Sequence, residues 1–380
     1  MSGRRGRKPG ANGREAPANG LGAARRGAEV ESKKKRKLLT IHQALNNDPV
    51  DVRTLRQCAV GEGGLLSDEI RRKVWPKLLN VNVYDLPSKP GMRADQRAVL
   101  QEQLINVILY VLQRNKQLHY YQGYHDVAVT FLLVVGERMA IALMEILSSH
   151  HLRDFMDPTM DSTKHILNYL MPILEQVKPV LHAFMQRAEV GTIFALSWLI
   201  TWYGHVLSEF RHTVRLYDFF LASHPLMPVY LAAAIVLHRE QEVLECECDM
   251  ASIHQLLSRI PPNLPYERLI AGAEELYSCY PPSELANQAS LQFYKSVTIS
   301  TFQDFQLATS QQRPDTVLCK LSRERARLDS GGARTPAPVG ANQLVKMVVW
   351  GLTATLGAAA FAVVNTAMEW APEFVSQLFP

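Results

Sequence analysis

The residues best suited to do chemistry in this sequence form one short run, Tyr121-Gln122-Gly123-Tyr124-His125-Asp126. A glutamine carboxamide both donates and accepts hydrogen bonds, which is what the orientation of a water molecule requires. The glycine that follows it lets another backbone approach closely. The run therefore predicts a residue that positions a reactant, and not a nucleophile or a metal ligand.

Signatures of other catalytic classes do not occur in the sequence. There is no glycine-rich phosphate loop, no nucleophile motif and no pair of histidines at metal-ligand spacing. Cys246 and Cys248 stand among acidic residues, in a pattern that is neither a zinc ligand set nor a disulfide framework. We therefore expect no metal site, no cofactor of the chain's own and no metabolic enzyme.

The positive charge is concentrated at the N-terminus. Residues 1–40 hold twelve Lys and Arg against three Asp and Glu, so the rest of the chain is slightly acidic although the whole carries +5. A nucleic-acid-binding protein needs a basic face on its fold, so no nucleic-acid partner is predicted. The tail is rich in Gly, Ala, Arg and Lys and has no hydrophobic period, which predicts that residues 1–40 are disordered.

The elements that position residues 121–126 are predicted to be helices. Between residues 41 and 313 apolar residues recur every three or four positions, which predicts an all-α domain. We expect helices to close near Pro172 and Pro179, whereas Pro225 and Pro228 bracket another helix start. The stretch 193–202 is apolar on all sides but too short to cross a bilayer, so we expect it to be a core helix.

The C-terminal part has a different character. Residues 314–343 are polar and contain Pro336 and Pro338, which predicts a linker. Residues 344–371 are expected to form a single transmembrane helix, because the 22 residues from Met347 to Met368 carry no charge and would form a helix of about 33 Å. Basic residues precede this tail anchor, which places the helical body in the cytosol. Its moderate hydrophobicity favours the thin membrane of the endoplasmic reticulum.

Three stretches resemble the TBC domain of Rab GTPase-activating proteins. Arg72-Lys73-Val74-Trp75-Pro76-Lys77-Leu78-Leu79 resembles the opening R-x-x-W-x-x-L-L signature, and residues 121–123 resemble the Y-Q-G motif. The stretch from Trp198 to Phe220 resembles the later R-x-x-D-x-F region, with Arg215 and Asp218. The resemblance implies an all-α, TBC-type helical domain at 41–313. It also implies structural roles for Arg72, Trp75, Trp198, Arg215 and Asp218, and motif or Rab-contacting roles for Tyr121, Gly123 and Asp126.

The resemblance also implies a mechanism. TBC domains supply a glutamine finger and an arginine finger in trans to a Rab, which carries the GTP and Mg²⁺ itself. Gln122 falls at the glutamine position. The sequence is thus expected to encode a membrane-anchored activator for Rab proteins of endoplasmic-reticulum-to-Golgi traffic, and not an enzyme in its own right, since the Rab performs the hydrolysis.

The arginine finger has no counterpart at its expected position. The family motif I-x-x-D-x-x-R, between the opening tryptophan and Y-Q-G, does not occur in residues 80–118. Leu65-x-x-Asp68-x-x-Arg71 fits part of the pattern but precedes Trp75, so we interpret it as coincidence. Arg93 and Arg97 are weak substitutes. The alternative hypothesis is therefore a catalytically deficient Rab-binding or membrane-tethering protein, and the missing motif favours it for this chain.

Overall fold

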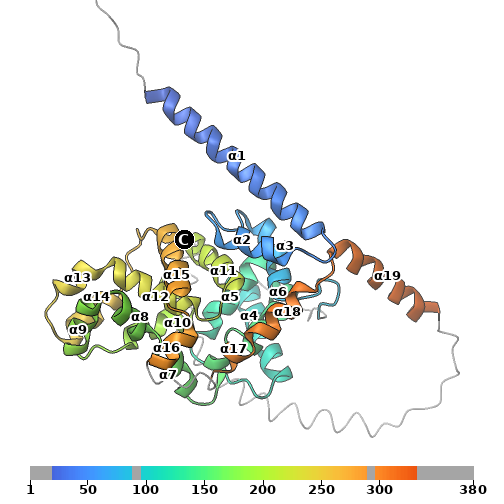
Figure 1. Cartoon of the computed structure of the whole chain (residues 1–380). Helices are drawn as coiled ribbons and strands as arrows, with labels where there is room; N and C mark the ends of the chain where they lie inside the picture. Colours follow the sequence, from blue (N-terminus) through green and yellow to red (C-terminus); the bar gives the residue numbers. More distant parts are fainter. Residues whose placement is uncertain (1–18, 88–95, 289–295, 332–380) are drawn as a thin grey trace, which may run out of the picture.

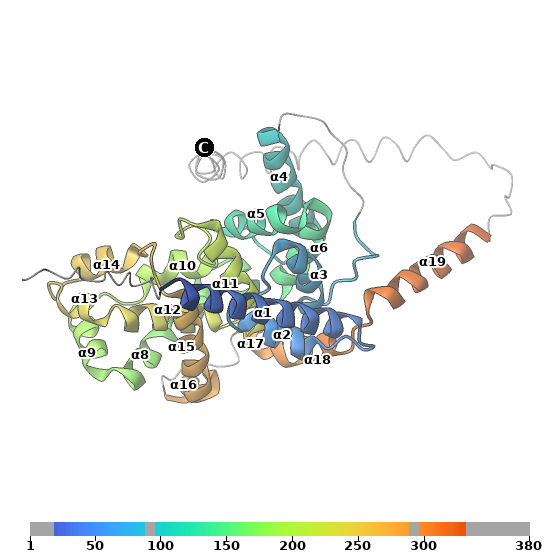
Figure 2. The same ribbon diagram turned by 90° about the horizontal axis from the view of Figure 1, so that it is seen from above.

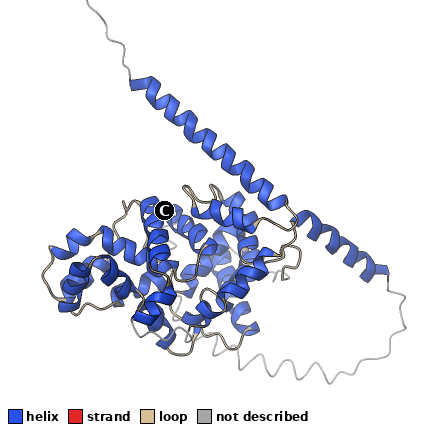
Figure 3. Cartoon of the chain, viewed as in Figure 1, coloured by secondary structure: helices blue, strands red, loops and turns tan. Residues whose placement is uncertain are grey.

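A computed structural model describes residues 19–87, 96–288 and 296–331, and all regular elements in these ranges are helices (Figure 3). The prediction of an all-α domain is confirmed for this part of the chain. The α-helices are α1 (Asn19–Asn46), α2 (Val52–Val60), α3 (Asp68–Leu78), α4 (Gln96–Arg114), α5 (Tyr124–Val135), α6 (Glu137–Ser149), α7 (Asp161–Leu167), α8 (Leu170–Val177), α9 (Pro179–Arg187), α10 (Leu196–Ile200), α11 (Phe210–Ala222), α12 (Met227–His238), α13 (Glu240–Leu244), α14 (Met250–Ser258), α15 (Tyr266–Cys279), α16 (Pro282–Gln288), α17 (Val297–Ser300), α18 (Phe302–Ser310) and α19 (Asp315–Gly331). Two short 3-10 helices are η1 (Arg153–Met156) and η2 (Ile193–Ala195).

Helix α12 is buried within the body, beside α15 (Figure 1). Every residue from Met227 to Val236 is buried, as expected for a helix that is apolar on all sides. Its main neighbour is α15, with α8 and α10 packed against other faces. Pro228 stands in its first turn, where proline costs no hydrogen bond, so the predicted helix start is confirmed. The predicted helix end near Pro172 is wrong for the same reason, because Pro172 lies in the first turn of α8. The predicted end near Pro179 is confirmed, since α8 ends just before Pro179 begins α9.

The three stretches that resemble the TBC domain meet in one aromatic core. The ring of Trp75 on α3 lies 5.2 Å from that of Phe131 on α5. Phe131 in turn lies 5.5 Å from Tyr217 on α11, and Tyr217 lies 5.4 Å from Trp202. Offset and edge-to-face rings at these distances attract one another beyond their burial alone. The aromatic core therefore fixes the first, second and third stretches against each other.

Helix α1 contradicts part of the prediction of a disordered tail. Residues 19–40 are helical. The helix projects away from the body in Figure 1 and runs across it in the view from above in Figure 2. Alanine, lysine, arginine and glutamate are good helix formers, and Glu29 and Lys33 form an ion pair one turn apart. The C-terminal turns are held to the body, where Lys37 Nζ donates to the carbonyls of Gly61 (3.2 Å) and Glu62 (2.8 Å). The charge pattern alone did not indicate this contact.

The region predicted as a linker at 314–343 also contains a helix, since α19 spans Asp315–Gly331. Lys77, whose side chain is buried, forms an ion pair with Asp315 at the start of α19 (2.5 Å) and thereby joins this helix to α3. The predicted membrane anchor at 344–371 lies outside the described residues. Within the ranges that the structure describes, no helix is long and apolar enough to cross a membrane.

A buried histidine makes the stability of the domain sensitive to acid. His151 is 3% exposed among the rings of Trp202, Phe302 and Phe305. Burial, assisted by the positive charge of Arg56, lowers the pKa of His151 to about 3. As the pH falls below about 6.5, the unfolded chain takes up a proton that the folded chain does not, so the free energy of unfolding decreases.

We expect the free energy of unfolding to fall by up to about 1.4 kcal/mol for each pH unit between 6.5 and 3 through His151 alone. Urea unfolding of the full chain at pH 7.5 and pH 5 measures the decrease, and His151→Phe should remove this part of it. His119, an exposed histidine, supplies the control variant His119→Ala. An equal pH dependence in the wild type and in His151→Phe would contradict the assignment.

Candidate functional site

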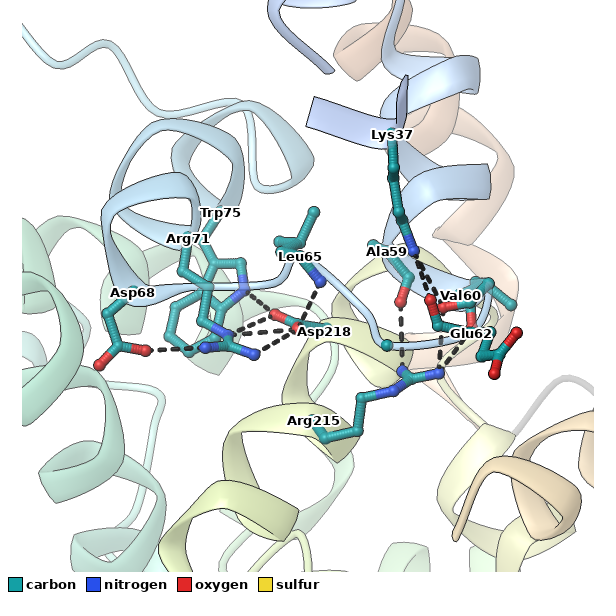
Figure 4. Close-up of polar contacts among 12 residues, drawn as sticks. Lys37, Ala59, Val60, Glu62, Leu65, Asp68, Arg71, Trp75, Arg215 and Asp218 are labelled. Atoms are coloured by element: carbon teal, nitrogen blue, oxygen red, sulfur yellow. Dashed lines mark hydrogen bonds and ion pairs between the residues drawn. The ribbon is translucent and has the colours of Figure 1, made fainter. Parts of the chain in front are cut away.

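The carboxylate of Asp218 on α11 is the centre of a buried polar cluster (Figure 4). It accepts hydrogen bonds from the Trp75 indole Nε1 (2.8 Å) and from the backbone N–H of Leu65 (2.9 Å). The Arg71 guanidinium donates to the same carboxylate through Nε and Nη2, at 3.0 and 2.9 Å. Trp75 and Asp218, for which the family resemblance implied structural roles, thus tie α3 to α11.

The arginine of this cluster is Arg71, whereas the sequence pattern pointed to Arg72. Arg71 and Trp75 lie four positions apart, so their side chains share one face of α3. Arg72 is rotated away from that face, and its Nε donates to the carbonyl of Val134 at 2.7 Å. Although burial lowers the pKa of Arg71, its contacts with Asp218 and Asp68 outweigh that effect and raise the pKa.

This ion pair also explains the partial arginine-finger pattern at residues 65–71. Leu65 supplies a backbone N–H to Asp218, and Asp68 and Asp218 both pair with Arg71. The Arg71 side chain is only 9% exposed and is committed to these carboxylates. It is therefore a structural residue, in agreement with the interpretation of the pattern as coincidence.

Arg215, one turn before Asp218 on α11, joins two further segments. It forms a bidentate ion pair with Glu267 on α15, at 2.9 and 2.8 Å. Its Nη atoms also donate to the carbonyls of Ala59 (3.2 Å) and Val60 (2.8 Å) at the end of α2 (Figure 4). The predicted structural role of Arg215 is consistent with these contacts. Sequence reasoning missed Glu267, since nothing near it in the chain marks it as a partner.

Gln122 lies in the tight turn that leads into α5, and its side chain is exposed. Gly123 ends this turn with φ 110°, a conformation that L-residues with a side chain rarely adopt. The backbone N–H of Tyr124 donates to the Tyr121 carbonyl (3.2 Å), and that of Asp126 donates to the Gly123 carbonyl (3.1 Å). The hydrogen-bonded turn thus holds the carboxamide of Gln122 at the surface of the domain.

The neighbours of Gln122 face inward. The ring of Tyr121 packs against Tyr124 and Phe155, at centroid distances of 5.8 and 6.0 Å, and its buried hydroxyl has no hydrogen-bond partner in the described structure. Gly123 is buried, and a Cβ there would lie 2.9 Å from Thr201 Cγ2. The sequence suggested that Gly123 admits the backbone of a partner. In the structure, the space next to Gly123 is filled by Thr201 of this chain.

Asp126 holds a small polar network beside the turn. Its carboxylate lies 3.6 Å from His125 Nε2 and 3.7 Å from Nδ1 of His205, a residue of the third stretch. The other ring nitrogen of His125 is hydrogen-bonded to the Tyr120 hydroxyl at 2.8 Å. Burial, assisted by the charge of Asp126, raises the pKa of Tyr120 to about 12. Asp126 thus supports the turn from inside the domain. His205 also belongs to this polar network, which the sequence did not reveal.

Thr201, which packs against Gly123, leads into a strained turn at Trp202 and Tyr203. The expected core helix at 193–202 is divided into η2 and α10, and the chain then reverses at Trp202 and Tyr203, with φ of 47° and 65°. Such values cost about 1–3 kcal/mol each for bulky residues and need a firm surrounding structure. Both side chains are buried, and the Tyr203 hydroxyl donates to the Pro228 carbonyl at 2.8 Å. Trp198 is buried as expected, packed on Phe194 and Tyr203.

The two weak substitutes for an arginine finger are not placed in a site. Arg93 lies outside the described residues, and Arg97 lies in the first turn of α4, where only the backbone is described. In the described ranges, no group of three or more His, Cys, Asp or Glu side chains is arranged to hold a metal ion.

We expect Gly123→Ala to lower the free energy of unfolding by about 1–3 kcal/mol, from its positive φ and its contact with Thr201. Gly191→Ala is the matched control, because Gly191 also has a positive φ but open space around it. Urea unfolding compares the two variants. Equal losses would show that the space beside Gly123 imposes no constraint on the turn.

Comparison with known proteins gives consistent matches. Residues 84–244 match the family model described as the Rab-GTPase-TBC domain. The chain is 61% identical over 381 residues to TBC1 domain family member 20 from Homo sapiens, covering 93% of this chain and 94% of that protein. It is 31% identical over 264 residues to GTPase-activating protein gyp10 from Schizosaccharomyces pombe, covering 62% and 71%. A solved structure of the Ypt/Rab-GAP domain of Gyp1p aligns with a TM-score of 0.49 and 14% identity, over 64% of this chain and 98% of that one.

Proposed function

Because this chain belongs to the Rab-GTPase-TBC family, we propose that it is a GTPase-activating protein that presents Gln122 to the nucleotide site of a Rab. The observation that carries the proposal is that the carboxamide of Gln122 is exposed on a turn whose other residues, Tyr121, Gly123 and Asp126, pack into the domain. An amide that donates and accepts can hold the attacking water in line with the γ-phosphate. GTP and Mg²⁺ belong to the Rab.

The expectation that the chain is not an enzyme is wrong. The family match and a relative named as a GTPase-activating protein point to GTPase activation, which counts as an enzyme activity even though the Rab supplies the reacting nucleotide. What the chain contributes is stabilisation of the transition state in trans.

The activation is proposed to be weak in this chain, because its sequence has no I-x-x-D-x-x-R motif between Trp75 and Tyr121. The alternative is a Rab-binding or membrane-tethering protein without any catalytic effect. Single-turnover GTP hydrolysis by a panel of Rab proteins, with and without the full chain, separates the two. Acceleration of one Rab that is lost in Gln122→Ala supports the first, and binding without acceleration supports the second.

We further propose that residues 344–371 anchor the protein in the endoplasmic reticulum membrane, with the helical body in the cytosol and a role in early secretory traffic. The uncharged stretch from Met347 to Met368 supports this. Deletion of residues 344–380 should release the protein into the soluble fraction. A glycosylation acceptor added after Pro380 should become modified, whereas one in the body should not. Continued membrane attachment of the deletion variant would point to the basic N-terminal region instead.

A further inference from the structure

A cavity of about 810 Å³ opens between α2, the junction of α11 and α12, and helices α15 to α18. Its lining contains neither Gln122 nor Asp218, so the proposed catalytic turn does not account for it. Volumes of this order are typical of sites for small organic molecules. The lining includes Arg56, His224, Met227, Glu274, Tyr277 and Phe302.

The positively charged group of this cavity, Arg56 on α2, has only neutral hydrogen-bond partners among the described residues. Its Nη1 donates to the Ala222 carbonyl (3.1 Å) and its Nη2 to the Thr309 hydroxyl (3.3 Å). In the described part of the chain, no ion pair involves Arg56, and the stretch 289–295 between α16 and α17 contains no acidic residue. A cation withdrawn from water normally has a carboxylate or another anion beside it.

Burial alone lowers the pKa of Arg56 to about 10, so the guanidinium stays charged at neutral pH. Its two hydrogen bonds leave N–H groups of the planar fork unassigned, and a guanidinium fork matches the two oxygens of a carboxylate or phosphate. The side chain is partly buried and lines the open cavity, so a ligand can reach it. The cavity is thus open to solvent and contains the positive charge of Arg56, which has no ion-pair partner among the described residues.

The remaining lining restricts the ligand further. Met227, Ile299 and Phe302 also line the cavity, and their apolar side chains suit a hydrocarbon chain. Glu274 is an exposed residue of the same cavity, and its charge disfavours a ligand with two negative charges. We propose that this cavity binds a small amphiphile with a single negative charge, held by Arg56 at its acidic head and by the apolar side chains at its tail.

Isothermal titration of the purified full chain in a neutral detergent tests the proposal with three soluble probes. Octanoate carries the charge and the chain, octanol carries only the chain, and acetate carries only the charge. We expect saturable binding of octanoate and at least tenfold weaker binding of the other two. Dihexanoyl phosphatidylglycerol, a phosphodiester with one charge, separates a phospholipid source from a fatty-acid source. The absence of saturable binding by both octanoate and this phospholipid would overturn the proposal.

Variants identify the role of Arg56. Arg56→Met should weaken octanoate binding at least tenfold and leave octanol binding unchanged, whereas Arg56→Lys should retain most of the affinity. Arg53→Met is the matched control, because Arg53 is exposed on the same helix. Glu274→Gln should tighten octanoate binding severalfold, which gives a test that survives if Arg56→Met fails to fold. Unchanged octanoate binding in Arg56→Met would show that Arg56 is only structural. If Arg56→Met does not fold, unchanged octanoate binding in Glu274→Gln would contradict the proposal.

Discussion

An arginine-bearing helix inserted between Tyr84 and Arg93 should raise Rab GTP hydrolysis by about 10³–10⁵ over the unmodified chain. Without a guanidinium, the charge that builds on the phosphoryl oxygens lacks one compensating partner, which corresponds to about 4–7 kcal/mol of transition-state stabilisation. Rab binding should change little, because a finger acts mainly in the transition state. Single-turnover hydrolysis with the two chains measures the difference.

The control is the same insertion with alanine in place of its arginine, which should leave the rate at the low level of the unmodified chain. Full activity in the unmodified chain, abolished by Arg93→Ala or Arg97→Ala, would mean that one of these arginines acts as a displaced finger.

Asp218→Ala should lower the free energy of unfolding by about 3–5 kcal/mol, because it leaves the Arg71 guanidinium buried without its main partner. The Trp75 indole and the Leu65 N–H lose their acceptor at the same time. Urea unfolding of the full chain measures the loss. Asp68→Ala removes the other partner of Arg71, a carboxylate whose side chain is 45% exposed, and should cost less than about 1 kcal/mol.

A double variant, Arg71→Met with Asp218→Leu, should recover part of this loss, since it leaves no buried charge unpaired. If Asp218→Ala costs no more than Asp68→Ala, the buried cluster is not what holds α3 against α11.

Local patterns in the sequence predicted the parts of the fold that depend on nearby residues. The spacing of apolar residues indicated helices, and Pro228 marked the start of α12. The family resemblance implied structural roles for Trp75 and Asp218, but not their hydrogen bond, because the two residues lie far apart in the chain. Arg71, and not the motif residue Arg72, faces Asp218, because a one-residue shift on a helix turns the side chain by about 100°. Only the position of α11 decides which of the two arginines pairs with Asp218.

In the candidate site, too, the local motif predicted some features, whereas others depend on residues far away in the chain. Gln122 could be identified from its motif, and the structure leaves it exposed. The reason for Gly123 could not be found in the sequence, because it depends on the approach of Thr201 from a turn 78 residues later. The helical state of residues 19–40 was missed for a related reason: Lys37 is held by the carbonyls of Gly61 and Glu62, a tertiary contact that a charge count does not reveal.

The measurement that tests the central claim most directly is single-turnover GTP hydrolysis by a responsive Rab with the arginine-restored chain, compared with its Gln122→Ala variant. If Gln122 orients the attacking water, the variant should lose roughly 10²-fold in rate while it still binds the Rab. Gln241→Ala, at an exposed glutamine on α13, should keep the full rate. Equal rates for the restored chain with glutamine and with alanine at position 122 would contradict the assignment of this residue as the glutamine finger.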